Sequence, residues 1–363
     1  MSAQQRINEL LAIVAQQGAS DLHLVVGSYP MIRVDGRLLP LSQDSILTAD
    51  DTKSIVDALL TDVQQQTLAD TGSVDFSYNY EDKARFRTNV FFQKGRLSVA
   101  MRLIPAKIRS LAELNVPEKL YDFAERSQGL VLMTGPVGHG KSTTLAALVD
   151  AINASRAAHI LTIEDPIEYI HTHNKAIINQ REIGQDARSF ADALRAALRE
   201  DVNVILVGEM RDLETIQTVM TAAETGHLIF ATLHTNDAAQ TVDRIVDVFP
   251  SHQQNQIRAQ LANVLLGVVS QRLLPRIGGG RIPAVEIMIK NHAIENLIRE
   301  NKSYQIDTVI ETSLQDGMIS LDKSLADLAS RGIVTQEDAL MYAKNREYFT
   351  MLMRDAAQQQ QQQ

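Results

Sequence analysis

The fold of this chain depends first on residues 129–144, Gly129-Leu-Val-Leu-Met-Thr-Gly-Pro-Val-Gly-His-Gly-Lys-Ser-Thr-Thr144. Its apolar part, Leu130 to Met133, predicts a buried strand, and Thr143 to about Ile152 has the apolar spacing of a helix. A glycine-rich loop ending in lysine and serine separates them. A strand, such a loop and a helix in this order predict a phosphate-binding loop, because this context distinguishes it from a chance match.

The residue types of this loop explain the prediction. Glycines let the backbone turn so that successive N–H groups point at phosphate oxygens, and the following helix adds its positive end. Lys141 is predicted to reach the β- and γ-phosphates, and the Ser142 hydroxyl to ligate Mg²⁺. We therefore expect a bound nucleoside triphosphate, held by Gly135, Pro136, Val137, Gly138, His139, Gly140, Lys141, Ser142 and Thr143.

Composition limits the class of protein. The chain has 363 residues, enough for two or three domains, with 45% hydrophobic and 22% charged residues. A net charge of −9 disfavours a large nucleic-acid interface, and the lack of cysteine excludes disulfides and thiolate zinc sites. No apolar run reaches the roughly 20 residues of a membrane span, and the N-terminus lacks a signal core. We expect a cytoplasmic protein without direct membrane insertion.

The residues before the loop predict a smaller α+β domain over 1–105 and a linker over 106–128 that contains Pro117. Expected helices cover 2–18 and 50–60. Expected strands cover 21–26, 31–39, 85–92 and 96–104, with a hairpin turn at Asp35-Gly36.

From Gly129 strands alternate with helices, which predicts an α/β core with a parallel sheet over 129–290. Expected strands cover 130–134, 159–163, 202–207 and 227–232, and expected helices cover 143–153, 189–199, 213–224 and 238–248. After about Pro283 the pattern is mostly helical, giving a helical region over 291–356. Residues 357–363 are nearly all glutamine and predict a disordered tail.

A second buried strand ends in Gly208-Glu209. An acidic residue at the end of a strand beside a phosphate-binding loop is typical of the Walker B motif, whose carboxylate holds Mg²⁺ directly or through water. The usual final Asp is absent, so Glu209 is the candidate metal-side carboxylate. The alternative is a surface carboxylate at a strand end.

A third strand runs into Glu164-Asp165-Pro166. Neighbouring parallel strands end at the edge where ligands bind, so Glu164 is a candidate to orient or deprotonate the attacking water. Acids that cap the following turn are the alternative.

His227 and His234 flank the next predicted strand, and either is a candidate to sense the γ-phosphate. Seven residues of strand separate them by roughly 20 Å, which excludes a shared metal. A structural hydrogen bond is the alternative for each.

Arg85, Arg87 and Arg102 alternate along two adjacent predicted strands before the linker. Guanidinium groups suit the charge that develops on a γ-phosphate. A solvated strand face is the alternative.

Together these motifs resemble the secretion ATPase superfamily, and within it the PilT-type ATPases that retract type IV pili. The resemblance extends from Gly18-Ala-Ser-Asp-Leu-His-Leu24 to Pro283-Ala-Val-Glu-Ile-Met-Ile289. It rests on the phosphate-binding loop, on Thr162–Glu168 as the Asp box, on Gly208–Asp212 as Walker B, and on Thr225 to Thr235 as the His box.

The resemblance implies a RecA-like P-loop NTPase core, a PAS-like N-terminal domain and a homohexameric ring that hydrolyses ATP. It also implies Glu164 as the catalytic glutamate, and Arg87 and Arg102 as arginine fingers. The expected partners are an inner-membrane pilus platform protein and paralogous pilus ATPases, so the motor would lie peripherally at the inner face of the cell membrane.

Two positions depart from the family pattern. Glu295 replaces an arginine in Ala293-Ile-Glu-Asn-Leu-Ile298, a segment linked to retraction, and His139 replaces a small residue of the loop. The absence of a four-cysteine zinc insertion favours the retraction branch over pilus-extension or type II secretion ATPases, which remain the alternative. A RecA-like DNA motor and a nucleotide-gated binding module that hydrolyses poorly are further alternatives.

Overall fold

The computed structural model describes residues 2–34, 37–80, 84–104 and 107–361. The chain divides into two compact units: unit 1 comprises Met1–Lys107 with Pro166–Ile170, and unit 2 comprises Ile108–Asp165 with His171–Gln363. Among the described helices, none has both the length and the apolar character needed to cross a membrane.

Unit 1 contains a six-stranded antiparallel sheet in the order β3-β2-β1-β6-β5-β4. The predicted apolar positions of the first helix, which include Ile7 and Leu10, are fully buried against it. Its elements are α1 (Ala3–Gln16), β1 (Asp21–Val25), β2 (Met31–Val34), β3 (Arg37–Pro40), α2 (Ala49–Leu59), α3 (Asp62–Thr71), β4 (Ser73–Tyr80), β5 (Ala84–Gln93) and β6 (Arg96–Ile104). α3 and β4 were not predicted.

Two predictions in this part of the chain fall on residues outside the described ranges. The hairpin turn at Asp35-Gly36 is one, although Val34 and Arg37 on either side of it are paired. The domain end at Pro105, with the start of the linker at Ala106, is the other.

Unit 2 is built on a seven-stranded sheet in the order β13-β12-β7-β11-β10-β8-β9, parallel except that β13 runs antiparallel to β12. The strands are β7 (Gly129–Thr134), β8 (His159–Glu164), β9 (Ile177–Glu182), β10 (Val204–Val207), β11 (Leu228–Leu233), β12 (Leu265–Pro275) and β13 (Arg281–Ile289). β7, β8, β10 and β11 confirm the predicted parallel sheet. β9, β12 and β13 were not predicted.

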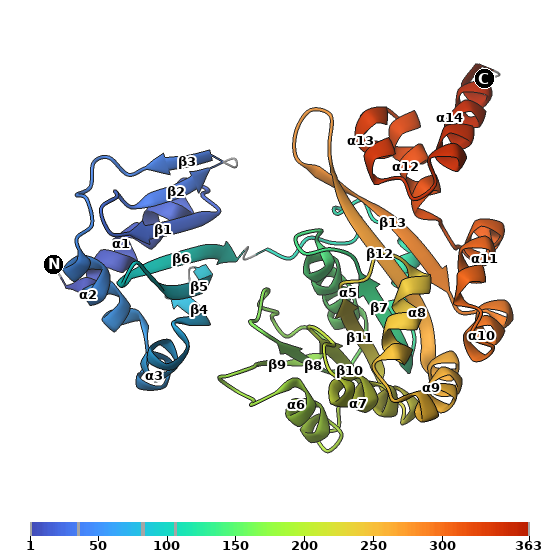
Figure 1. Ribbon diagram of the computed structural model, residues 1–363, viewed down its shortest axis with the longest axis horizontal. Coiled ribbons are helices and arrows are strands. Elements are labelled where there is room, and N and C mark those ends of the chain that lie inside the picture. The colour runs from blue at the N-terminus through green and yellow to red at the C-terminus, as the bar shows by residue number, and fades with distance from the viewer. Residues whose placement is uncertain (1, 35–36, 81–83, 105–106, 362–363) are drawn as a thin grey trace. The chain divides into compact units, whose positions relative to one another are not determined.

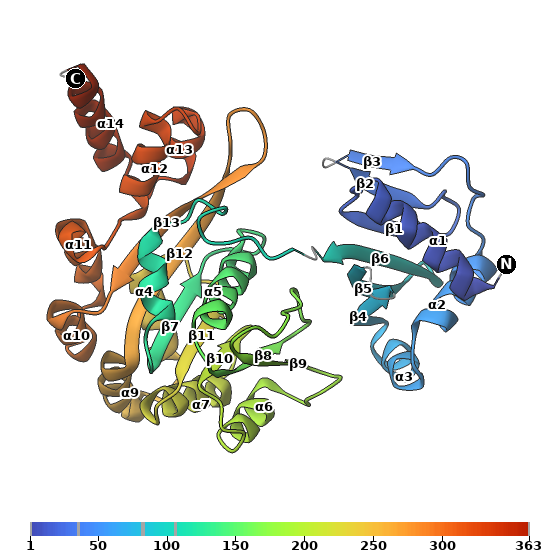
Figure 2. The same ribbon diagram turned by 180° about the vertical axis from the view of Figure 1, so that it is seen from behind.

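Helices cover both faces of this sheet. They are α5 (Lys141–Ser155), α6 (Phe190–Ala197), α7 (Leu213–Glu224), α8 (Ala238–Asp247) and α9 (Ser251–Val264). β7 shows the layering, because Leu130 and Leu132 pack in one apolar cluster with α6 to α9, whereas Val131 and Met133 pack in another with α5. α8 and α9 cover the face seen in Figure 1, and α5 covers the face seen in Figure 2.

The predicted linker is not a free connection. Leu111, Leu120 and Phe123 are buried in the same cluster as α5, so these residues form part of the core of unit 2. The segment contains the short helices η1 (Glu118–Leu120) and α4 (Tyr121–Ala124).

The C-terminal region is helical and begins at His292, next to the predicted start at 291, whereas residues 283–289, where a mostly helical pattern was expected, belong to β13. It contains α10 (His292–Arg299), η2 (Ser303–Gln305), α11 (Ile306–Thr312), η3 (Leu314–Asp316), α12 (Leu321–Ser330), α13 (Gln336–Tyr342) and α14 (Arg346–Gln361). Leu325 and Phe349 of this region pack on Leu274 and Ile282 of the β12–β13 hairpin.

α14 extends into the glutamine run as far as Gln361, where the composition predicted disorder. Glutamine has a good helix propensity, and adding residues to an existing helix is favourable even when no core is available. Gln362 and Gln363 lie outside the described residues.

Candidate nucleotide-binding site

The phosphate-binding loop connects β7 to α5, and its geometry requires glycine. Gly135, Gly138 and Gly140 have φ values of 133°, 79° and 81°, a region that L side chains rarely adopt. A Cβ at Gly135 would overlap the carbonyl oxygen of Gln271, and one at Gly140 would lie 2.9 Å from the Gln271 Nε2. The loop is therefore shaped by backbone conformation and by β12 behind it.

β12 holds the loop through polar contacts that the sequence did not reveal. Gln271 Nε2 donates to the His139 carbonyl oxygen at 2.8 Å, and its Oε1 accepts from Thr144 Oγ1 at 2.9 Å. The Leu273 N–H donates to His139 Nδ1 at 2.9 Å. A polar Ser-Gln-Arg interruption at 270–272 of an otherwise apolar strand was the available signal.

Lys141 is the first residue of α5, and only 7% of it is exposed. Its Nζ donates to the carbonyl oxygens of Gly135 at 2.7 Å and Pro136 at 2.9 Å, and lies 3.4 Å from His234 Nδ1. The ammonium is thus held over the cradle of the loop, where phosphate oxygens would bind.

The remaining predicted loop residues surround this position. Val137 is 81% exposed at the outside of the loop, and Ser142 and Thr143 are half-buried in the first turn of α5. Their location fits the predicted binding of phosphate and Mg²⁺.

The strand order places the other candidates in a row, because β11 lies between β7 and β10, and β8 lies next to β10. His234 follows β11, and its Nε2 is 3.1 Å from Glu209 Oε1 after β10. One histidine thus contacts Lys141 with Nδ1 and Glu209 with Nε2. The carboxyl edge of the sheet brings together residues that are far apart in sequence.

Glu209 is held in its ionised form. Burial alone would raise its pKa, but the hydrogen bond and charge of Arg211, whose Nε lies 2.6 Å away, and the hydrogen bond from His234 keep the pKa below the usual value. An ionised carboxylate is the form that ligates a divalent cation.

Gly208 explains why Glu164 lies beside Glu209. The Gly208 N–H donates to the Ile163 carbonyl oxygen at 2.8 Å, and a Cβ on Gly208 would come within 3.3 Å of Glu164 Cα. Glu164 Oε1 accepts from Thr162 Oγ1 at 2.7 Å. The close approach of the two strand ends therefore places both carboxylates at the same edge.

His227 is not part of this group. It precedes β11, at the amino end of the strand, and its Nδ1 lies 3.0 Å from the Ala222 carbonyl oxygen. The six residues of β11 separate it from His234 by about 20 Å. His227 therefore lies away from the nucleotide edge of its own unit, and its contact with Ala222 corresponds to the structural alternative.

Arg87 and Arg102 lie in unit 1, where they are directly opposite each other on β5 and β6. Arg102 Nε is 2.9 Å from Asp21 Oδ1 and 71% of its side chain is exposed. Arg87 NH1 is 4.0 Å from Glu168 Oε1 and 44% exposed. Two like charges directly opposite destabilise a sheet, which makes the pair a candidate anion site as well as a solvated face.

The residues at the edge of unit 2 fit a nucleotide-bound Mg²⁺. Within the described ranges no three His, Asp or Glu side chains are grouped as a metal site of their own. Mg²⁺ in such proteins is held by one or two protein oxygens together with phosphate oxygens and water. Ser142, with its hydroxyl, and Glu209, with its carboxylate, supply that donor set.

Comparisons with known proteins show which family the chain resembles. The family described as type II/IV secretion system protein matches residues 2–280. The chain is 47% identical over 348 residues to the type IV pilus retraction ATPase PilT of Pseudomonas aeruginosa, covering 94% of this chain and 99% of that protein. It is 48% identical over 319 residues to a twitching motility protein of Neisseria gonorrhoeae, covering 88% and 85%.

Solved structures give the same result. A crystal structure of the pilus retraction motor PilT with bound ADP superimposes with a TM-score of 0.87 at 48% identity, covering 94% of this chain and 98% of that one. The ATPase DotB of Legionella pneumophila superimposes with a TM-score of 0.82 at 23% identity, which shows the shared fold alone.

Proposed function

This chain belongs to the type II/IV secretion system protein family, and we propose that it is the ATP-hydrolysing motor that powers type IV pilus retraction and twitching motility. The core of unit 2 has the RecA-like fold of secretion ATPases. The observation that carries the proposal is the row Lys141–His234–Glu209 at the carboxyl edge of its sheet, in a chain 47% identical to PilT.

The row assigns a task to each side chain. Phosphate oxygens replace the Gly135 and Pro136 carbonyl oxygens as partners of Lys141, which then carries the charge of the β- and γ-phosphates. His234 contacts Lys141 and Glu209 together, so it responds to whether a γ-phosphate is present. Ser142 and Glu209 are the residues that would hold Mg²⁺, which would supply positive charge against the phosphate oxygens.

Glu164 acts on the attacking water. Its carboxylate orients the water and accepts one of its protons, while the water oxygen bonds to the γ-phosphorus and the bond to the ADP oxygen breaks. The neighbouring Thr162 hydroxyl donates a hydrogen bond to one oxygen of the Glu164 carboxylate and fixes the orientation of that carboxylate.

Arg87 and Arg102 act as arginine fingers that neutralise charge in the transition state. Support comes from their directly opposed positions on β5 and β6 and from their exposure. They act when the chain assembles into a homohexamer, whose subunits would complete one another's sites.

The motor works at the cytoplasmic face of the inner membrane on a pilus platform protein, alongside paralogous pilus ATPases. The segment that departs from the family pattern forms α10, where Glu295 Oε1 accepts from Arg299 NH2 at 2.6 Å. Because Arg299 balances the charge of Glu295 on the same helix, the substitution is compatible with coupling through this segment.

A pilus-extension or type II secretion ATPase is the second candidate. The chain is 35% and 32% identical to two type II secretion proteins of Pseudomonas aeruginosa, but it covers only 51% and 53% of their lengths. Coverage of 99% of PilT favours retraction.

A deletion strain tests the direction of force. We expect excess surface pili and loss of twitching, both restored by the wild-type gene but not by Lys141→Ala. Loss of surface pili in the deletion strain would instead assign the protein to pilus assembly.

A further inference from the structure

Residues 342–345, at the end of α13 and in its connection to α14, contact both loops of the nucleotide site. We call this segment the C-terminal clasp. One contact reaches the phosphate-binding loop, and the other reaches the β11–α8 loop that carries His234. Both lie within unit 2.

The first contact joins Tyr342 to His139. The two rings meet edge to face, with centroids 6.2 Å apart and an interplanar angle of 72°. The His139 ring points away from the cradle, because its Nδ1 accepts from the Leu273 N–H behind the loop. A small residue at position 139 could make neither contact.

The charges around His139 keep the ring neutral. Burial lowers its pKa, and so do the positive charges of Arg272 on β12, Lys141 on α5 and Arg281 on β13. Only the neutral ring offers Nδ1 as an acceptor for the Leu273 N–H. The ring is therefore a fixed link between the loop and α13.

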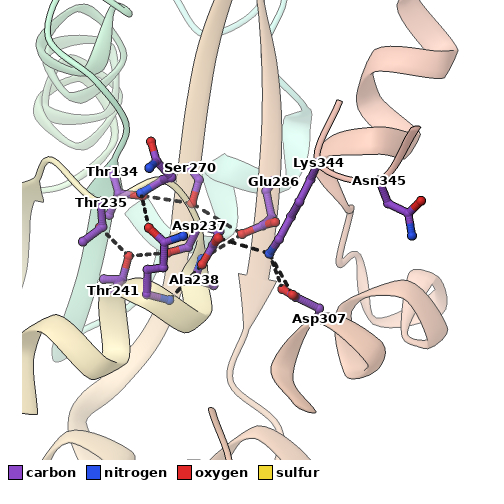
Figure 3. A network of polar contacts seen from close by, with 12 residues as sticks. Thr134, Thr235, Asp237, Ala238, Thr241, Ser270, Glu286, Asp307, Lys344 and Asn345 are labelled. Carbon is purple, nitrogen blue, oxygen red and sulfur yellow. Dashed lines mark hydrogen bonds and ion pairs between the residues drawn. The ribbon is translucent and has the colours of Figure 1, made fainter. Parts of the chain in front are cut away.

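The second contact joins Lys344 to the β11–α8 loop. Lys344 Nζ lies 3.1 Å from Asp237 Oδ2 and 2.7 Å from Asp307 Oδ2, as Figure 3 shows. Asp237 caps α8 by accepting from the Gln240 N–H at 2.8 Å, and it is three residues after His234. Lys344 therefore pairs with the loop that carries His234, the residue that contacts Lys141 and Glu209.

A buried carboxyl connects this ion pair to β7. Glu286, 3% exposed, accepts from the Ala238 N–H at 2.8 Å and lies 3.5 Å from Ser270 Oγ. Ser270 Oγ in turn accepts from Thr134 Oγ1 at 2.9 Å, directly before the phosphate-binding loop. Figure 3 shows this chain of contacts running from Lys344 back to Thr134.

The clasp is itself held in place. The backbone N–H groups of Lys344 and Asn345 donate to the two carboxylate oxygens of Asp322, at 2.8 and 2.9 Å. Asp322 is 4% exposed in α12. These two hydrogen bonds attach the clasp to α12.

We propose that the C-terminal clasp positions both nucleotide loops, with Tyr342 acting through His139 on the phosphate-binding loop and Lys344 acting through Asp237 on the loop of His234. The side chains of Tyr342, His139 and Lys344 act by positioning, because none of these side chains is assigned a contact with reacting atoms. The inference rests on the proposed ATPase activity and assigns to α12–α14 a role in setting it.

The two contacts predict different kinetic effects. The phosphate-binding loop holds the phosphates before and during reaction, so loosening it weakens ATP binding and raises KM. The loop of His234 contacts Lys141 and Glu209, which act on the charge of the transition state, so loosening it lowers kcat.

The test is steady-state ATP hydrolysis by full-length variants. We expect Tyr342→Ala and His139→Ser to raise KM about 3- to 10-fold with kcat within about twofold, and Lys344→Met to lower kcat about 3- to 10-fold with KM within about twofold. Tyr342→Phe keeps the ring and should retain the wild-type KM.

Lys323→Met is the matched control for Lys344→Met. Both lysines lie in the C-terminal region with side chains 37% exposed and paired to aspartate, but the partner of Lys323 is Asp327 on α12. We expect wild-type kinetics for this control. The double variant His139→Ser, Tyr342→Ala should be no worse than the poorer single variant, because one contact is lost in each case.

Kinetics of Tyr342→Ala and Lys344→Met that match the control would overturn the clasp. So would equal changes in KM and kcat in both variants with a lowered melting temperature, since those indicate general destabilisation. Lys141→Ala separates the two proposals: hydrolysis by this variant contradicts the proposed ATPase site, whereas an inactive Lys141→Ala beside unaffected clasp variants removes the clasp alone.

Discussion

The carboxyl edge of the unit 2 sheet and the arginine pair of unit 1 are proposed to act on the same nucleotide, yet they are built differently. At the sheet edge Lys141 is 7% exposed and His234 lies against both Lys141 and Glu209. In unit 1 Arg87 and Arg102 are 44% and 71% exposed, with one acidic partner each.

From this difference we infer that the sheet edge is complete within one chain, whereas the arginine pair is not. Residues at the sheet edge are fixed by strand order and by contacts with each other, so ATP binding should need only unit 2. Among the described residues the two opposed arginines contact different carboxylates, those of Glu168 and Asp21, and such a cationic pair gains most when a shared anion binds. Hydrolysis should therefore depend on assembly more than binding does.

Lys141→Ala should have the largest effect. Removing the charge on the β- and γ-phosphates should reduce turnover by at least about 10²- to 10³-fold and also weaken ATP binding. Phosphate release and fluorescent-nucleotide binding measure the two quantities. Near-normal hydrolysis by the purified variant would contradict the assignment of the sheet edge.

Arg87→Ala and Arg102→Ala sharpen the comparison, because they should separate hydrolysis from binding. An arginine finger contributes about 10³-fold or more to turnover, so we expect a loss of that order with ATP affinity much less changed. Arg96→Ala, on the same strand as Arg102 and exposed, is the matched control. Wild-type turnover in both finger variants would show that the pair is a solvated strand face.

Glu164→Gln should reduce turnover by roughly 10²-fold or more and leave ATP binding intact, since the amide cannot accept a proton from water. Glu209→Gln should also suppress hydrolysis, with a raised Mg²⁺ requirement. Glu224→Gln, exposed at the end of α7, controls for the loss of one charge. A wild-type rate for Glu164→Gln would return this residue to the role of a cap.

A buried carboxyl, that of Glu286 on β13, also lies behind the sheet edge. Burial raises the pKa of Glu286 to about 7, whereas the ordinary pKa of a glutamate, as in the unfolded chain, is 4.5. Between these two pH values Glu286 keeps its proton in the folded state and loses it in the unfolded state. The free energy of unfolding therefore falls as pH rises through this range, by up to about 3 kcal/mol.

Urea unfolding at pH 5 and pH 8 measures this contribution. Glu286→Gln keeps an acceptor for the Ala238 N–H and should reduce the difference between the two pH values. An unchanged pH dependence in the variant would mean that Glu286 does not titrate in this range.

The two histidines that flank β11 should give the smallest contrast. His234→Gln should lower kcat by about tenfold, because Lys141 and Glu209 lose a shared partner, while His227→Gln should stay within about twofold. Phosphate release measures the turnover of both variants. A larger loss of kcat in His227→Gln would mean that His227 affects hydrolysis from a position away from the carboxyl edge of its own sheet.

Much of unit 2 could be predicted because its motifs stand at strand ends. β7, β8, β10 and β11 are short apolar runs followed by a glycine loop, acids or a histidine, and each of these patterns is local in sequence. Parallel pairing then implies one shared edge. The same rule could have excluded His227, since it precedes its strand.

Other features depend on contacts between distant segments. β12 was missed because polar residues at 270–272 interrupt its apolar pattern, and those residues are polar because Gln271 holds the phosphate-binding loop. The buried linker and the clasp likewise depend on packing against elements far away in sequence. β4 does not depend on such contacts. Its alternation of Val74, Phe76 and Tyr80 with polar residues is a local strand pattern that could have been predicted from the sequence.

We expect hydrolysis to need an assembled ring in which unit 1 arginines complete the site. Specific ATPase activity, measured against protein concentration alongside sedimentation, tests it most directly. We predict that activity per chain rises with concentration in parallel with the hexamer fraction, while ATP binding per chain stays constant. Full specific activity in a sedimenting monomer would contradict the account.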